Sequence, residues 1–131
     1  MAATVSVRLM LCGLLCAALL ASCFATALAR YRLAPADEYF GRSKMSILEI
    51  NNRLRECTFR AQHGVRAGVI LGDARRTEDA MTDWGRKYPA DPWLAHYWWR
   101  LASLYSLMPS STAHARATIA LVQFRRYGHS R

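Results

Sequence analysis

Residues 92–108 read PWLAHYWWRLASLYSLM and carry three of the four tryptophans in the chain. On a helix this stretch is apolar on nearly every side, because large apolar or aromatic residues recur without a continuous polar face. A helix of this kind must pack against neighbours from more than one direction. We therefore expect residues 92–108 to form the central helix of an all-helical domain.

The residues on either side of this helix set its ends and start the next one. Asp91 is a suitable N-cap and Pro92 a suitable first helical residue, while Pro109 stops the helix. A serine or threonine at 110–112 then caps a fourth helix, which Gly128 closes. The apolar stripe of that helix consists of Ala113, Ala117, Ala120, Phe124 and Tyr127.

A first helix is expected over about residues 43–62. Ser46 and Glu49 have the spacing of a capping box, and Gly64 is a natural stop. The apolar positions follow helical spacing and comprise Ile47, Ile50, Leu54, Cys57 and Ala61.

Glycine then recurs every four residues, at Gly64, Gly68 and Gly72. Because Arg66 interrupts this run, we interpret it as a flexible loop with a short apolar plug at residues 69–71. A second helix follows over about residues 73–88, with one face formed by Thr77, Met81, Trp84 and Tyr88.

Part of the central helix resembles a known repeat. Trp98-x2-Leu101-Ala102-x2-Tyr105 is similar to the first-helix pattern W-x2-L-G-x2-Y of a tetratricopeptide (TPR) repeat. The preceding turn, residues 87–93, resembles turns between TPR units of bacterial envelope proteins. The resemblance covers residues 74–131 and implies one unit plus the second helix of another.

This resemblance implies an all-α fold of about four helices, arranged as two antiparallel hairpins over residues 43–131. TPR-like hairpins present a groove that selects extended or helical segments of a partner. A small irregular four-helix domain is the alternative, since two hairpins are fewer than the roughly three repeats that usually make a stable stack.

The N-terminal segment, residues 1–29, predicts export. Arg8 precedes a run without charge that ends in Ala27-Leu28-Ala29, as in a signal peptide cleaved after Ala29. Leu20-Ala21-Ser22-Cys23 also resembles a lipobox, which would make residues 1–22 the signal and place a lipid on Cys23. A retained membrane anchor is the third alternative, although Arg30 and Arg32 beyond the run oppose it.

Export divides the chain into the signal, an extension over residues 30–42, and the helical domain over residues 43–131. We expect a periplasmic protein or, if Cys23 is lipidated, a membrane-anchored one. Only Cys57 lies outside the signal, so the mature chain has no pair for an internal disulfide. Its place on the apolar stripe predicts a buried, inert thiol.

Charge narrows the class of partner. The chain has a net charge of +9, and no acidic residue follows Asp91. A basic surface suits an anionic partner, and export argues against nucleic acid. The expected partners are therefore another envelope protein, a second copy of this chain, or an anionic membrane surface.

The sequence contains no recognisable catalytic or cofactor motif. Its four histidines lack metal-ligand spacing, and neither a nucleophile elbow nor a phosphate-binding glycine loop is present. Asp79 and Asp83 share a helix face, which is typical of a solvated surface. We expect a non-catalytic protein without metal or cofactor, and an enzyme with an unrecognised site is the weaker alternative.

The candidate binding residues come from the central helix. Trp93, Trp98 and Trp99 cannot all point into one small core, so at least one is expected to remain partly exposed. Together with Arg100 they are the candidate partner-binding residues, because tryptophan and arginine dominate the energetics of protein interfaces.

Overall fold

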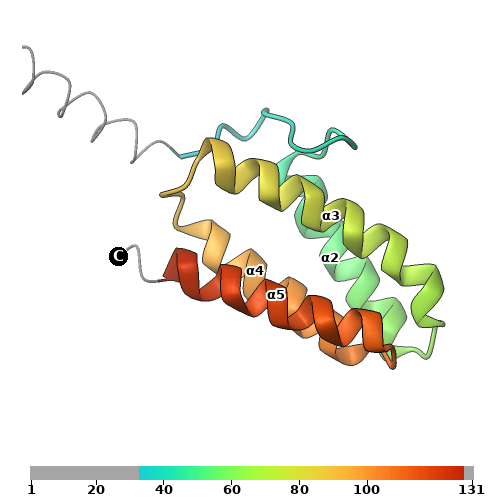
Figure 1. Ribbon diagram of the computed structural model, residues 1–131. Coiled ribbons are helices and arrows are strands. Elements are labelled where there is room, and N and C mark those ends of the chain that lie inside the picture. The colour runs from blue at the N-terminus through green and yellow to red at the C-terminus, as the bar shows by residue number, and fades with distance from the viewer. Residues whose placement is uncertain (1–32, 129–131) are drawn as a thin grey trace, which may run out of the picture. The chain divides into compact units, whose positions relative to one another are not determined.

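The computed structural model describes residues 33–128, and this part of the chain is all-helical, as predicted (Figure 1). Its four helices are α2 (Ile47–Gln62), α3 (Ala67–Lys87), α4 (Trp93–Leu107) and α5 (Ser111–Gly128). None of these helices is long and apolar enough to cross a membrane. The predicted signal features Ala27, Ala29 and Cys23 lie outside the described residues.

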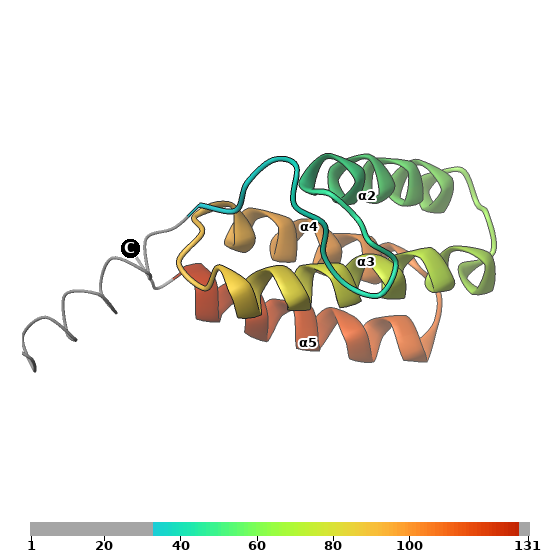
Figure 2. The same ribbon diagram turned by 90° about the horizontal axis from the view of Figure 1, so that it is seen from above.

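The helices run alongside one another with α4 at the centre. α4 packs along α5 and also contacts α2 and α3, while α2 packs against α3. Figure 2 shows α2 and α5 at opposite edges, with α3 and α4 between them. The packing therefore confirms that residues 92–108 form the central helix. Membership of the TPR family remains a prediction.

The core is built around α4 because that helix is apolar on several sides. Its buried side chains are Leu94, Tyr97, Trp98, Leu101, Ala102, Leu104 and Tyr105. α5 meets them with alanines at 113, 117 and 120, whose small side chains let the two helices approach closely. Trp84 of α3 and Leu54 of α2 complete the core from the other side.

α2 begins four residues later than predicted, but its capping box is present. Ser46 Oγ accepts a hydrogen bond from the backbone N–H of Glu49 at 3.2 Å. The helix ends before Gly64, whose φ of +74° lies in the left-handed region that favours glycine. The local signals were therefore correct at both ends of this helix.

α3 corrects the prediction of a flexible loop. The helix begins at Ala67, so Gly68, Gly72 and the expected plug are helical. Ile70 is fully buried and lies on the same face as Ala74 and Thr77. Burial of this face outweighs the low helix propensity of two glycines, about 1 kcal/mol each.

The segment ahead of α2, residues 33–46, packs onto the helices (Figure 2), and we call it the strap. Phe40 is fully buried, with its ring 5.9 Å from that of Trp84 and 6.1 Å from that of Tyr88. Phe40 also forms an isolated antiparallel bridge with Met45. The compact unit that contains the helices also includes Leu33, so part of the expected extension packs with the helical domain.

Carboxylates of α3 hold the turn of the strap. Asp83 accepts the backbone N–H of Gly41 and Asp79 accepts that of Arg42, both at 3.0 Å. Gly41 has a φ of +68°, and a Cβ there would lie 2.8 Å from the Cα of Ala80. The solvated face predicted from Asp79 and Asp83 is thus a binding surface for the chain's own backbone.

Candidate partner-binding groove

The three tryptophans of residues 92–108 differ in their exposure to solvent. Trp93 and Trp99 are exposed over 61% and 51% of their surface, and Arg100, which follows Trp99, is partly buried. Trp98, by contrast, is only 2% exposed, and its side chain packs into the core. Its place on the inner side of α4 follows from its spacing to Leu101, Ala102 and Tyr105.

Trp99 and Arg100 line a groove of about 750 Å³ between α2 and α4. Trp99 and Leu107 contribute exposed apolar surface from α4, and Phe59 contributes it from α2. Arg55 of α2 and Arg100 of α4 add positive charge from both walls. We call this feature the α2–α4 groove.

A hydrogen bond crosses between the two walls near one end of this groove. Arg100 Nη1 donates to Asn51 Oδ1 of α2 at 2.5 Å. The guanidinium carbon of Arg100 also lies 5.7 Å from the centre of the Tyr97 ring. Arg100 is thereby held in place along its length, which lowers the entropy lost when it binds a further group.

Trp93 lies in a second, smaller hollow of about 380 Å³. The strap contributes Leu33 and Ala34 to this hollow, α2 contributes Ile47, Leu48 and Asn51, and α4 contributes Trp93 and Tyr97. Asn51 of α2 lines this hollow, whereas the groove is lined by Asn52, so the two depressions have no lining residue in common. The structure thus brings Trp99 and Arg100 together in one groove and places Trp93 in a separate hollow.

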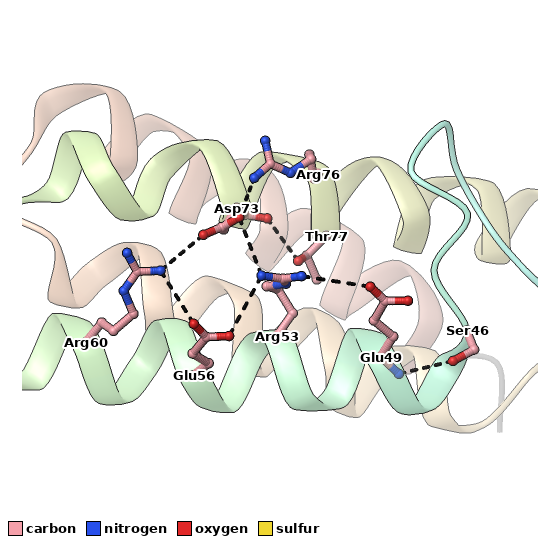
Figure 3. Close-up of polar contacts among 8 residues, drawn as sticks. All are labelled: Ser46, Glu49, Arg53, Glu56, Arg60, Asp73, Arg76 and Thr77. Atoms are coloured by element: carbon pink, nitrogen blue, oxygen red, sulfur yellow. Dashed lines mark hydrogen bonds and ion pairs between the residues drawn. The ribbon is translucent and has the colours of Figure 1, made fainter.

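An ion-pair network joins α2 to α3 (Figure 3), and it pairs the acidic residue that lines the groove. Asp73 of α3 accepts from Arg60 at 3.1 Å and lies 3.7 Å from Arg53. Glu56, the acidic residue that lines the groove, pairs with the same two arginines at 3.7 and 3.8 Å. Arg55 has no hydrogen-bond or ion-pair partner among the described residues, so the groove keeps a positive excess.

Sequence reasoning missed the two α2 residues of the groove, Phe59 and Arg55. Phe59 is mostly exposed and stacks on His63, with ring centres 3.9 Å apart. The available signal was its position off the apolar stripe of α2, since a large aromatic there faces solvent or a partner. The sequence pattern of α2 does not indicate that α4 lies opposite Phe59 and Arg55.

The reactive or ionisable side chains of Glu78, Tyr105, Arg116 and Cys57 contribute to packing within the fold. Glu78 accepts hydrogen bonds from Tyr105 at 2.6 Å and from Arg116 at 2.7 Å, which joins α3 to α4 and α5. Burial raises the pKa of Tyr105, and the Glu78 carboxylate raises it further. Burial likewise raises the pKa of the Cys57 thiol to about 11, as fits the buried, inert thiol that was expected.

Among residues 33–128 no cluster of three or more His, Cys, Asp or Glu side chains has a geometry for a metal ion. Comparison with known protein families, with curated proteins and with solved structures found no match. The α2–α4 groove is therefore a candidate binding site on the basis of its own geometry and charge.

Proposed function

We propose that this chain is an exported, non-catalytic helical module that binds a segment of another envelope protein in the α2–α4 groove. The observation that carries this proposal is Trp99, half-exposed in a groove whose two walls each supply an arginine. A tryptophan in a hollow with arginine beside it is the usual composition of an interface hot spot. The preferred occupant has apolar side chains next to carboxylates, which Arg55 and Arg100 would receive.

The state of the acidic residues favours a different protein over a second copy. Of the nine acidic residues, Asp37 alone makes no side-chain hydrogen bond or ion pair within the described residues. The other eight carboxylates pair within the fold, and the two most exposed of them, Glu49 and Glu56, are paired with Arg53 and Arg60 of the same helix. We therefore favour an acidic segment of another chain as the occupant of the groove.

The binding experiment uses the chain from Arg30, the expected mature form, which keeps the whole described core. Peptides are selected from a random library displayed on phage, and their affinities are measured by fluorescence anisotropy. We expect selected peptides to combine Asp or Glu with large apolar residues. Replacing Trp99 with Ala should weaken their binding by about tenfold or more, as at other interface hot spots.

Charge reversal and a matched control complete the test. Arg55→Glu should also weaken these peptides, whereas Tyr39→Ala, an exposed aromatic on the strap, should leave affinity and helicity unchanged. Peptides that bind equally to the Trp99→Ala variant would overturn the groove as the binding site. Trp99-dependent peptides without acidic residues would overturn the assignment of an acidic partner.

Export is tested separately by mass spectrometry of the mature N-terminus. A start at Arg30 supports a soluble exported protein, and a lipid-modified Cys23 supports a membrane-anchored one. A chain that retains Met1 in cells would contradict processing and revive the membrane anchor.

A further inference from the structure

A hollow of about 560 Å³ lies where the turn of the strap meets α3 and α5. Four arginines line it: Arg42 from the strap, Arg75 and Arg76 from α3, and Arg116 from α5. The volume lies within the range of about 300–1,000 Å³ that is usual for small-molecule sites. We call this feature the arginine hollow.

The carboxylates of the hollow are already used by the fold. Glu78 accepts hydrogen bonds from Tyr105 and Arg116, and its side chain is only 12% exposed. One oxygen of Asp79 accepts the backbone N–H of Arg42 at 3.0 Å and lies 3.5 Å from Nε of the same residue. Four arginines therefore face two carboxylates, which leaves an excess of two positive charges in the hollow.

Two of these arginines have donors to spare for a ligand. Arg75 is exposed and makes no side-chain hydrogen bond or ion pair within the described residues. The side chain of Arg42 is 92% exposed, and its ion pair with Asp79 uses Nε, so neither Nη atom has an acceptor in the described fold. Guanidinium groups with free donors bind anionic oxygens strongly and in a fixed, planar geometry.

Arg76 has a carboxylate partner, but that partner is shared. Asp73 pairs with Arg76, and its oxygens also lie 3.1 Å from Arg60 and 3.7 Å from Arg53 (Figure 3). One negative charge is thus divided among three guanidinium groups. Arg76 therefore adds to the positive potential of the hollow.

The composition of the hollow selects the class of ligand. Its other lining residues are Ser43 and Thr82, so it has no apolar wall to hold a hydrophobic side chain. This distinguishes it from the α2–α4 groove, with which it shares no lining residue. Guanidinium groups bind phosphate oxygens in pairs, and a phosphate monoester carries a charge of about −1.5 to −2 at pH 7, which matches the positive excess of the hollow.

We propose that the arginine hollow binds a phosphate monoester, whose oxygens are received by Arg42, Arg75 and Arg76. Arg116, held by Glu78, closes the α5 side of the site. A carboxylate is a poorer ligand, because it supplies one negative charge and two acceptor oxygens where a phosphate monoester supplies about two charges and three oxygens. The hollow is separate from the α2–α4 groove, so its role does not depend on the proposed partner.

The test is isothermal titration calorimetry of the chain from Arg30 with glycerol 3-phosphate, and with acetate at the same ionic strength. The strap and the helices belong to one compact unit, and circular dichroism checks that each variant is folded. We expect glycerol 3-phosphate to bind at least about tenfold more tightly than acetate, because of its greater charge. Arg75→Gln and Arg42→Gln should each reduce the affinity for glycerol 3-phosphate by about tenfold, since each removes charged hydrogen bonds to the ligand.

Co-sedimentation distinguishes a soluble phosphate ester from a lipid headgroup. The vesicles are phosphatidylcholine with and without phosphatidic acid, whose headgroup is itself a phosphate monoester. Arg75-dependent binding to the vesicles with phosphatidic acid supports a lipid headgroup, whereas binding of glycerol 3-phosphate alone supports a soluble ester.

Arg66→Gln is the matched control, because Arg66 is also an exposed arginine, at the start of α3, but does not line the hollow. It should bind both probes like the unsubstituted chain. The proposal is overturned if neither probe binds, if acetate binds as tightly as glycerol 3-phosphate, or if the folded Arg75→Gln and Arg42→Gln variants retain full affinity. It is equally overturned if Arg66→Gln weakens binding as much as Arg75→Gln, because the arginines would then act only through net charge.

Discussion

Trp84 donates its indole N–H to the carboxylate of Asp91 at 3.1 Å, which ties α3 to the turn that begins α4. The same carboxylate accepts the backbone N–H of Ala34 in the strap and that of Trp93 at the start of α4, both at 3.0 Å. Asp91 is only 4% exposed. One buried acceptor therefore holds three segments together around the N-terminal end of the central helix.

Replacing Asp91 with Ala should be strongly destabilising. Three donors would lose their acceptor, and we expect the free energy of unfolding to fall by about 3 kcal/mol, since each unsatisfied buried donor costs about 1–3 kcal/mol. Urea denaturation followed by tryptophan fluorescence measures this change. Asp37→Ala is the control, because Asp37 is exposed and should shift the midpoint little. Equal midpoints for both variants would contradict the role of Asp91.

The strap can be tested with two neighbouring aromatics. Phe40 is fully buried against Trp84 and Tyr88, whereas Tyr39 is mostly exposed. Phe40→Ala should lower the free energy of unfolding by about 3–5 kcal/mol, and Tyr39→Ala by less than about 0.5 kcal/mol. Thermal melts of the two variants decide this. If Phe40→Ala melts like Tyr39→Ala, the strap contributes no core.

Gly41 and Gly64 share a positive φ but differ in their surroundings. At Gly64 a Cβ would meet nothing within 4 Å, so Gly64→Ala should cost only the left-handed conformation, about 1–2 kcal/mol. At Gly41 the Cβ would lie 2.8 Å from the backbone of α3, which cannot move aside without shifting the helix. We expect Gly41→Ala to be clearly the more destabilising substitution in urea denaturation, and the reverse order would contradict the close packing of the strap.

The central helix could be predicted from sequence because its signals are local. Apolar residues all round require burial, and Pro92 and Pro109 mark both ends. The strap could not be predicted, because Phe40 and Tyr39 are adjacent aromatics in a segment without periodicity, and the partner that buries Phe40, Trp84, lies on α3. The predicted start of α3 was wrong for a related reason. The glycines disfavour a helix locally, but the helix forms because it buries Ile70, and that burial depends on tertiary packing.

Half of the candidate groove was predictable in the same way. An excess of large aromatics on one helix indicated that some must be exposed, but the choice between Trp98 and Trp99 depends on which sides of α4 are covered by α5 and α2. Phe59 and Arg55 joined the groove only because α2 packs beside α4. Pattern along one helix therefore identifies candidates, and packing selects among them.

The carboxylates that hold the strap predict a specific response to acid. The hydrogen bond from the Gly41 backbone, and then that from Arg86, lowers the pKa of Asp83, while the Tyr88 hydroxyl and Lys87 lower the pKa of Glu38. Because both pKa values are lower in the folded chain than in the unfolded one, the unfolded chain binds more protons as pH falls. This stabilisation is complete above the unfolded-state values, about 4, and is lost as pH falls through the folded-state values.

Asp83→Asn separates this effect from general acid denaturation. An asparagine oxygen can still accept the Gly41 N–H, but it does not titrate, so we expect a shallower dependence of the urea midpoint on pH in the acid range. The variant should be less stable than the original chain at neutral pH, and the two curves should converge in acid. Asp37→Asn is the control for removing a carboxylate, since the Asp37 side chain makes no hydrogen bond or ion pair in the described fold. An Asp83→Asn curve parallel to that of the original chain at every pH would show that the strap is not held by this carboxylate.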